Sequence, residues 1–434
     1  MHDSTRRILC RLAFVALCLA PSGSLCAWVI YRSTPIHAWQ EQAYWTESIY
    51  QTTGLLAEVE NVRHPTRSRT LLEGVTLKDP DGERLVARIR VLEFADTDHG
   101  IVAIASQPEI EANQLQRLGQ LLYQRVLRGP RPAQQFQLLS GELTLHGTSG
   151  ASTASDVRCV VSSHRDKIET TIDFLLAGFE MHSPAQVKLS RERNAGKAST
   201  SWQIRTGGTP LPCALLSDYL PALRSLGENS HFQGTAWVQQ DDESWDGEIA
   251  GQFRGVDLDS LVAPFPHKLS GTAELVLSHT NFRRGKLVEA AGALSSDGGV
   301  ISRSLLTAAA ESLKLGSSVI SDEQADTLLS YRQLALGFQI DDSGLLLSGL
   351  CDERQEGVLL VGTSGNLLLD SRTELIPSIA IARALVPQSE LQVPATSATE
   401  YLLRALPLPS PTLPSSRTAR APYSPLRYGG ESQR

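Results

Sequence analysis

Methionine and aromatic residues are scarce in this chain of 434 residues: methionine occurs twice, and aromatic residues make up 6% of the sequence. Glycine and proline, by contrast, number 33 and 22. A helical bundle needs long uninterrupted apolar faces, whereas a fold of many short strands joined by turns accommodates this composition. The composition therefore favours a mainly β fold, and the chain is long enough to bury an ample core.

An excess of positive charge is also absent. The chain carries 40 Lys and Arg residues against 47 Asp and Glu residues, which gives a formal net charge of -7 at pH 7. Proteins that bind nucleic acid present basic patches to the phosphate backbone. We therefore expect no nucleic-acid partner.

Arrangements of residues that carry out chemistry are missing as well. The ten histidines are scattered, and no His-Glu-x-x-His segment occurs. The two Gly-Thr-Ser-Gly segments, at 147–150 and 362–365, lack the spacing of a nucleophile elbow. The densest carboxylates, between 241 and 248, fall where a hairpin turn is expected. We therefore predict a binding or structural protein, not an enzyme, with no catalytic residues, no metal and no cofactor.

Cysteine is used sparingly. Cys10, Cys18 and Cys26 lie in an apolar N-terminal segment, which leaves Cys159, Cys213 and Cys351 far apart in the sequence. One disulfide among these last three would suit an exported protein, and the sequence does not choose the pair. The other interpretation is that all three are small buried apolar residues.

The segment 1–34 predicts a membrane anchor or a signal segment. Arg6, Arg7 and Arg11 precede an apolar run, which breaks at Pro21-Ser22-Gly23-Ser24 and resumes from Leu25 to Tyr31. A helix from Ile8 to Tyr31 is long enough to cross a bilayer, and the arginines would keep its start in the cytoplasm. We expect a single-pass anchor in the inner membrane with the rest of the chain in the periplasm. The alternative is secretion after signal cleavage.

Residues 35–129 are expected to hold a helix, β-hairpins and a second helix. The first helix, from Pro35 to Thr52, carries aromatic residues that suit either the headgroup level of a membrane or a cap on the open end of a sheet. Hairpins follow, with turns at His64-Pro65, 79–82 and 96–100. The second helix, from Ala112 to Leu127, ends at Gly129-Pro130.

Three further regions complete the chain. Residues 130–230 show strand patterns at 136–146, 157–161, 168–176, 187–189 and 202–205, and a helix at 212–223. Residues 231–406 alternate between apolar and polar positions most clearly at Gln333 to Ile340. This region also contains a helical patch at 255–266 and short helices at 379–385 and 399–406. Residues 407–434, rich in Pro, Ser and Arg, read as a disordered tail.

Several segments together resemble the AsmA-like family of envelope proteins, especially its C-terminal region. They are GVTLKDPDGERLVARIRVLEF at 74–94, GQFRGVDLDSLVAPFP at 251–266, LSGTAELVLSHTNFRRGKLVEAAGAL at 269–294 and LALGFQIDDSGLLLSGL at 334–350. The resemblance implies one N-terminal membrane helix, a long curved antiparallel sheet with an apolar groove, and a part in phospholipid transfer and outer-membrane homeostasis.

The fold class we predict is accordingly mainly β, with a few short helices and a long curved antiparallel sheet behind a transmembrane helix. An apolar sheet face must be covered by another layer or by an apolar ligand. Five inward positions are candidates for lining a groove for acyl chains of membrane lipids: Leu275, Leu277, Leu336, Phe338 and Ile340. The alternative is a structural scaffold that docks envelope proteins without moving lipid. The oligomeric state remains open.

Overall fold

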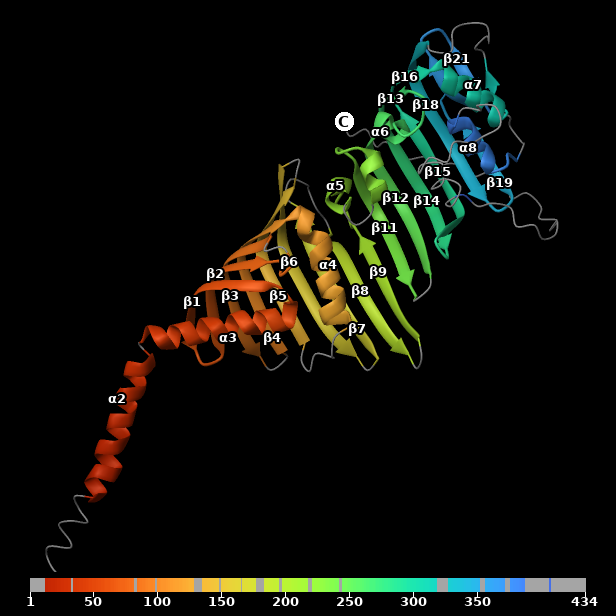
Figure 1. Cartoon of the computed structure of the whole chain (residues 1–434). Helices are drawn as coiled ribbons and strands as arrows, with labels where there is room; N and C mark the ends of the chain where they lie inside the picture. Colours follow the sequence, from red (N-terminus) through yellow and green to blue (C-terminus); the bar gives the residue numbers. More distant parts are fainter. Residues whose placement is uncertain are drawn as a thin grey trace, which may run out of the picture.

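The computed structural model describes residues 12–32, 34–81, 84–97, 100–128, 135–147, 150–164, 166–176, 183–194, 197–217, 221–241, 244–317, 327–351, 356–370, 375–386 and 406. One helix projects from a body that is dominated by a single sheet of 21 strands (Figure 1). The mainly β prediction is therefore confirmed. The tail at 407–434 lies outside the described residues.

The projecting helix contains a π-helical turn η1 (Val15–Leu19) and α2 (Ala20–Arg32). Its segment from Leu12 to Tyr31 has a mean hydropathy of 1.9, and none of that segment is buried in the protein. The helix continues through the polar interruption at 21–24, as the expected helix from Ile8 to Tyr31 requires, and its described residues begin at Leu12. Pro21 is the second residue of α2 and follows η1 after Ala20, and a π-helical turn beside a proline accommodates its ring and its missing N–H by shifting the hydrogen-bond pattern. Length and apolarity suit a membrane span, and a signal sequence has the same properties.

The first half of the sheet consists of nine strands that neighbour one another in chain order. These strands are β1 (Leu56–Thr66), β2 (Arg69–Lys78), β3 (Leu85–Thr97), β4 (Gly100–Glu111), β5 (Gln135–Gly147), β6 (Gly150–His164), β7 (Lys167–Leu176), β8 (Ala185–Asn194) and β9 (Lys197–Arg205). The turn expected at His64-Pro65 is wrong, because both residues lie within β1 and the chain turns just after Thr66.

One pair in this half departs from the expected antiparallel sheet. β4 and β5 run parallel, as in the pairing of Ala103 with Leu138. Parallel neighbours need a connection that crosses the sheet face. That connection contains η2 (Ala112–Gln114), α4 (Leu115–Leu121) and the π-helical η3 (Leu122–Leu127), together called the crossover helix. The helix predicted from Ala112 to Leu127 is thus present, and it joins parallel strands.

The second half of the sheet continues from β9 through β11 (His231–Gln240), β12 (Trp245–Asp257), β14 (Thr272–Arg283), β15 (Lys286–Ser296) and β18 (Leu328–Asp341). Short strands complete its edges: β10 (Leu211–Pro212), β13 (Leu269–Ser270), β16 (Gly299–Ser302), β17 (Gly316–Ser317), β19 (Gly344–Gly349), β20 (Val358–Gly362) and β21 (Asn366–Leu369). The regions expected at 35–129, 130–230 and 231–406 therefore share one sheet.

The helices of the second half agree only partly with the sequence patterns. The helix expected at 212–223 is replaced by α5 (Cys213–Leu216) and the 3-10 helix η4 (Pro221–Leu226). α6 (Leu258–Val262) and α8 (Ile379–Leu385) lie where they were expected, and α7 (Arg303–Ser312) was missed. The piece expected at 399–406 lies outside the described residues except for Leu406.

All the longer helices of the body pack on one face of the sheet, which we call the inner face (Figure 1). At one end, α3 (Pro35–Thr53) buries Ile49 against β1 to β4. The crossover helix buries Leu127 against β7 and β8. At the other end, α6 and α7 pack over β11 to β18, and α8 packs on β18 and β19. The prediction that the first helix caps a sheet is therefore confirmed.

The sheet bends where residues with positive φ interrupt the alternation of side chains. Leu72 and Val75 in β2 are both buried although they are three positions apart, because Gly74 between them has φ 65°. Ala154 and Val161 in β6 are likewise both buried although they are seven positions apart. Asp156 between them, with φ 50°, shifts the alternation by one residue. Such local irregularities redirect a strand and increase its twist. They keep the apolar side chains on the inner face across the bend.

Two glycines bring the backbones of β11 and β12 close together, and their substitution tests this contact. Gly234 faces Gly251 in register, and a Cβ on Gly251, whose φ is 151°, would lie 2.4 Å from the Gln233 carbonyl oxygen. We predict that Gly251→Val lowers the free energy of unfolding of the full-length chain by about 2 kcal/mol or more. Urea unfolding followed by circular dichroism measures this change.

The control for this prediction is Gly141→Ala, also within a strand, where a Cβ meets nothing within 4 Å. It should change the unfolding free energy by less than about 0.5 kcal/mol. Equal losses in the two variants would contradict the argument.

Candidate functional site

The inner face carries an apolar line of side chains that lie directly opposite one another on nine successive strands. Each is the register partner of the next across the sheet from β3 to β12. This central row consists of Phe94, Ala103, Leu138, Cys159, Ile172, Val187, Ile204, Ala236 and Ile249. The residues from Leu138 to Ile249 are all half-buried. The row therefore keeps apolar surface accessible in the middle of the sheet.

The five residues predicted from the sequence lie together on the same face, farther along the sheet. Leu275 pairs with Leu294, which pairs with Leu336. The neighbouring row joins Leu277, Gly292 and Phe338 in the same way. Ile340 lies two positions beyond Phe338 on the same strand, so the alternation seen in the sequence describes one apolar face.

Helices cover this C-terminal part of the inner face. Ile340 is only 4% exposed and packs with Ile376 and with Ala380 of α8. Leu275, Leu277 and Leu336 are half-buried, and they pack against a cluster that contains Leu258 of α6 and Leu306 of α7. The predicted residues thus contribute to a core, and Ala236 and Ile249 of the central row pack against the same cluster. The sequence pattern predicted two of the strands that carry the central row, at 168–176 and 187–189. It did not predict which residues of neighbouring strands lie opposite one another.

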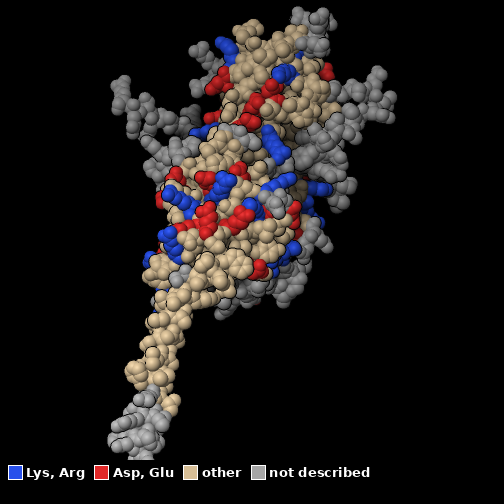
Figure 2. Space-filling model, turned by 60° about the vertical axis from the view of Figure 1, so that its left-hand side comes forward, with Lys and Arg blue, Asp and Glu red and all other residues tan. Residues whose placement is uncertain are grey.

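The opposite, outer face is polar and carries ion pairs. Glu169 of β7 accepts an ion pair from Lys188 at 2.8 Å and a second from Lys167 at 3.4 Å. Partial burial alone would raise the pKa of the Glu169 carboxyl, but the two ammonium groups lower it overall. Figure 2 shows Lys, Arg, Asp and Glu side chains gathered over the body of the protein, whereas the segment from Leu12 to Tyr31 of the projecting helix contains none of these residues. The ion pairs of Glu169 lie on the face opposite the central row.

The three cysteines of the body are free thiols, so the possible disulfide among them is not formed in the structure. Cys159 belongs to the central row, where burial and then the nearby Asp173 carboxylate raise the pKa of its thiol to about 11. Burial likewise raises the pKa of the Cys213 thiol. Both residues serve as small apolar groups, in agreement with the second interpretation of the sequence.

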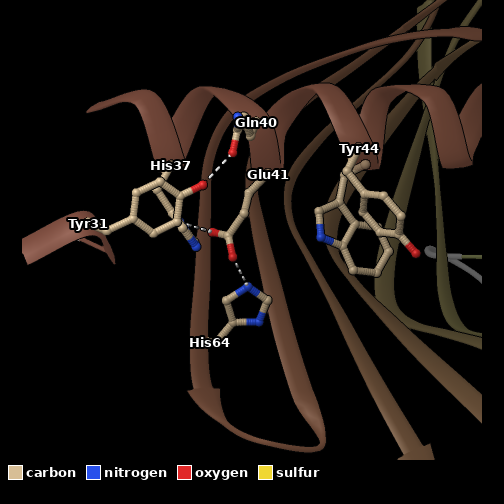
Figure 3. Close-up of a pocket in the computed structure, with 7 residues that line it drawn as sticks. Tyr31, His37, Gln40, Glu41, Tyr44 and His64 are labelled. Carbon is tan, nitrogen blue, oxygen red and sulfur yellow. Dashed lines mark hydrogen bonds and ion pairs between the residues drawn. The ribbon is translucent and has the colours of Figure 1, made fainter. Parts of the chain in front are cut away.

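A pocket lies beside the end of the apolar helix, and we call it the juxtamembrane pocket (Figure 3). It has a volume of about 290 Å³. Its lining comes from the end of α2, the first turns of α3, and β1, and consists of Tyr31, His37, Gln40, Glu41, Tyr44, Trp45 and His64. Sequence analysis missed this pocket, because His64 is distant in sequence from the other lining residues.

Glu41 lies at the centre of the polar contacts in the pocket. Its two carboxylate oxygens lie 3.1 Å from Nε2 of His64 and 3.6 Å from Nδ1 of His37. The Tyr31 hydroxyl donates a hydrogen bond of 2.6 Å to the Gln40 side chain. These contacts tie the last turn of the apolar helix to α3 and to β1, which fixes the pocket against the body.

The pocket and the central row meet at one side chain. Trp45 lines the pocket and stacks on Phe94, the first residue of the row, with ring centroids 5.2 Å apart and an angle of 14° between the rings. The apolar surface of the sheet therefore begins next to the juxtamembrane pocket.

Metal binding finds no support in the described part of the chain, where no group of three or more His, Cys, Asp and Glu side chains is arranged to hold an ion. The chain matches no protein-family model, and neither curated proteins nor solved structures give a significant match. Functional inference therefore depends on the geometry of the inner face and of the pocket.

The thiol in the central row predicts a dependence of stability on pH. Because the pKa of Cys159 is about 11 in the folded chain, its thiol ionises in the unfolded chain first. The stability that the neutral thiol contributes is fully present below about pH 8.5 and is lost as the pH rises through the folded pKa. We predict that wild type loses about 2 kcal/mol relative to Cys159→Ala between about pH 8.5 and about pH 11.

Denaturant unfolding of both full-length chains over this pH range measures the difference. A Cys18→Ala chain, changed at a thiol that the body does not bury, should follow wild type. Parallel pH profiles of wild type and Cys159→Ala would contradict the expected shift.

Proposed function

We propose that this protein is a membrane-anchored envelope protein that binds phospholipid by its acyl chains along the inner face of the sheet. The observation that carries the proposal is the central row, an apolar line in register across nine strands whose residues from Leu138 to Ile249 are half-buried. The resemblance of the sequence to AsmA-like envelope proteins supports the same function. Catalysis has no part in this proposal.

The dimensions of the row suit an acyl chain. Neighbouring strands lie about 4.8 Å apart, so the eight spacings between nine strands extend over about 38 Å. One leaflet contributes about 15 Å to the hydrocarbon core of a bilayer. The row is therefore longer than one lipid tail, and a tail lying across the strands stays on apolar surface throughout.

Continuity of the row matters for the energy of moving a lipid tail. Each methylene group that leaves an apolar environment for water costs about 0.8 kcal/mol, so five exposed methylenes cost about 4 kcal/mol. An unbroken apolar row avoids this cost at every step along the sheet. Ion pairs such as that between Glu169 and Lys188 lie on the outer face, which supports placing the proposed lipid on the inner face.

The anchor supplies the contact with a membrane. The arginines at positions 6, 7 and 11 precede the apolar helix, an arrangement that keeps this end in the cytoplasm and the body outside it. Since α3 joins the anchor to β1, the central row starts close to the bilayer. Inner-membrane anchoring with the sheet in the periplasm is thus part of the proposal.

A scaffold that docks envelope proteins is the second candidate. It is favoured by the C-terminal part of the inner face, where α6, α7 and α8 cover the sheet. A scaffold does not need the accessible central row, so changes within that row distinguish the two functions.

The test introduces polar side chains into the central row. We predict that the double variant Ile172→Asn with Ile204→Asn reduces co-purifying phospholipid at least about fivefold, because a buried amide without partners disfavours an apolar ligand. The full-length protein is extracted in mild detergent, and bound lipid is counted by mass spectrometry.

Thr171→Asn with Gln203→Asn is the matched control, since both residues lie one position away on the outer face and are also half-buried. This control should carry as much lipid as wild type. A wild-type protein that carries no lipid and takes none from vesicles would exclude the lipid-binding function and favour the scaffold.

The fate of the apolar N-terminal helix is tested separately. We predict that the chain stays in the membrane fraction after an alkaline carbonate wash, because the 20-residue segment from Leu12 to Tyr31, with a mean hydropathy of 1.9, is long enough to span a bilayer. Intact-mass measurement should show these residues still attached. A soluble chain that lacks them would show that the helix is a cleaved signal.

A further inference from the structure

The juxtamembrane pocket lies at the depth of the lipid headgroups if the apolar helix spans the bilayer. Tyr31, the last residue of the apolar segment, is one of its walls. On α3 next to it, Ile36, Trp39 and Tyr44 are 60%, 68% and 67% exposed. Large apolar rings with polar tips favour the membrane interface. Both observations place the opening of the pocket among headgroups.

Glu41 supplies a carboxylate to the pocket. Its oxygens lie 3.1 Å from Nε2 of His64 and 3.6 Å from Nδ1 of His37, and Nδ1 of His64 lies 3.1 Å from the Thr70 hydroxyl oxygen. No Lys or Arg is among the lining residues, so no permanently charged cation offsets the Glu41 carboxylate. The pocket thus favours a cation over a free phosphate.

Aromatic rings complete the lining. Tyr31 lies on one side of Glu41 and Tyr44 on the other (Figure 3). Trp45 also lines the pocket, and it meets Tyr44 edge to face at 5.7 Å between ring centroids. Rings of this kind attract an ammonium group through their π-faces, most strongly where water is partly excluded. A carboxylate together with three aromatic rings is a suitable lining for a substituted ammonium.

We propose that the juxtamembrane pocket binds the ammonium group of a zwitterionic phospholipid, such as phosphatidylethanolamine, with Glu41 as its counter-ion. This inference rests on the proposed lipid-binding function and adds the class of headgroup to it. Because Trp45 also stacks on Phe94, a headgroup in the pocket lies where the central row begins. The acyl chains of the same lipid then have the apolar inner face beside them.

The experiment measures headgroup preference and total lipid separately. Full-length protein is incubated with vesicles of phosphatidylethanolamine and phosphatidylglycerol in equal amounts, re-isolated, and its lipid quantified by mass spectrometry. Lipid bound to wild type should be enriched in phosphatidylethanolamine over phosphatidylglycerol. In Glu41→Gln the ratio of the two bound lipids should fall about fivefold, while the total amount of bound lipid stays the same. Glu47→Gln, a change on the same helix at a residue outside the pocket, should behave as wild type.

A second measurement uses a probe without acyl chains. Saturation-transfer NMR of the full-length protein in detergent should show binding of glycerophosphoethanolamine to wild type and to Glu47→Gln, with weaker binding to Glu41→Gln. Glycerol phosphate, which lacks the ammonium group, should give no signal.

The outcomes separate the two proposals. Equal lipid ratios in wild type and Glu41→Gln, or equal probe binding, would overturn the ammonium pocket while bound lipid still supports the inner-face function. Probe binding that depends on Glu41, in a protein that carries no phospholipid, would support the pocket and overturn acyl-chain binding.

Discussion

The apolar inner face of a very wide sheet has to be covered, and the rest of the structure follows from how this is done. Exposed apolar area on this scale is unfavourable in water, so a second layer must form or a ligand must bind. Helices form part of that layer: Ile49 and Leu306 are buried against the strands at the two ends, and Leu127 of the crossover helix is buried against β7 and β8. Between the ends, residues such as Ile172 and Val187 stay half-buried. The function we propose assigns lipid to that middle section.

Local sequence patterns predicted the parts of the fold that depend on neighbouring residues. Alternation predicted the strand that contains Leu336 and Phe338, and the helical segments predicted at 255–266 and 379–385 correspond to α6 and α8. The parallel pairing of β4 with β5 could not be read in this way, since a helix between two strands is compatible with several placements. α7 was missed because it begins directly after strand β16, with no loop between them. Its N-cap, Ser302, is also the last residue of that strand, so the sequence pattern gives little sign that a helix begins there.

The functional surface was harder to predict than the fold, because it depends on register between distant strands. The five residues chosen from the sequence do share a face, but α8 packs over Ile340, and nothing in the local pattern announces that contact. The juxtamembrane pocket likewise needs His64 to meet Glu41, which requires β1 to lie along α3. Long-range pairing of this kind is set by tertiary packing and not by propensity.

The parallel junction has a consequence for the order in which the protein folds. β4 and β5 pair residues that lie 35 positions apart, such as Gly100 with Gln135, whereas their neighbours in the first half pair across short turns. Closing the longer loop loses more chain entropy before any contact stabilises it, so local hairpins form ahead of it. On this argument we expect the first four strands and the five that follow to form separately. Docking of the crossover helix would then join the two small sheets into one.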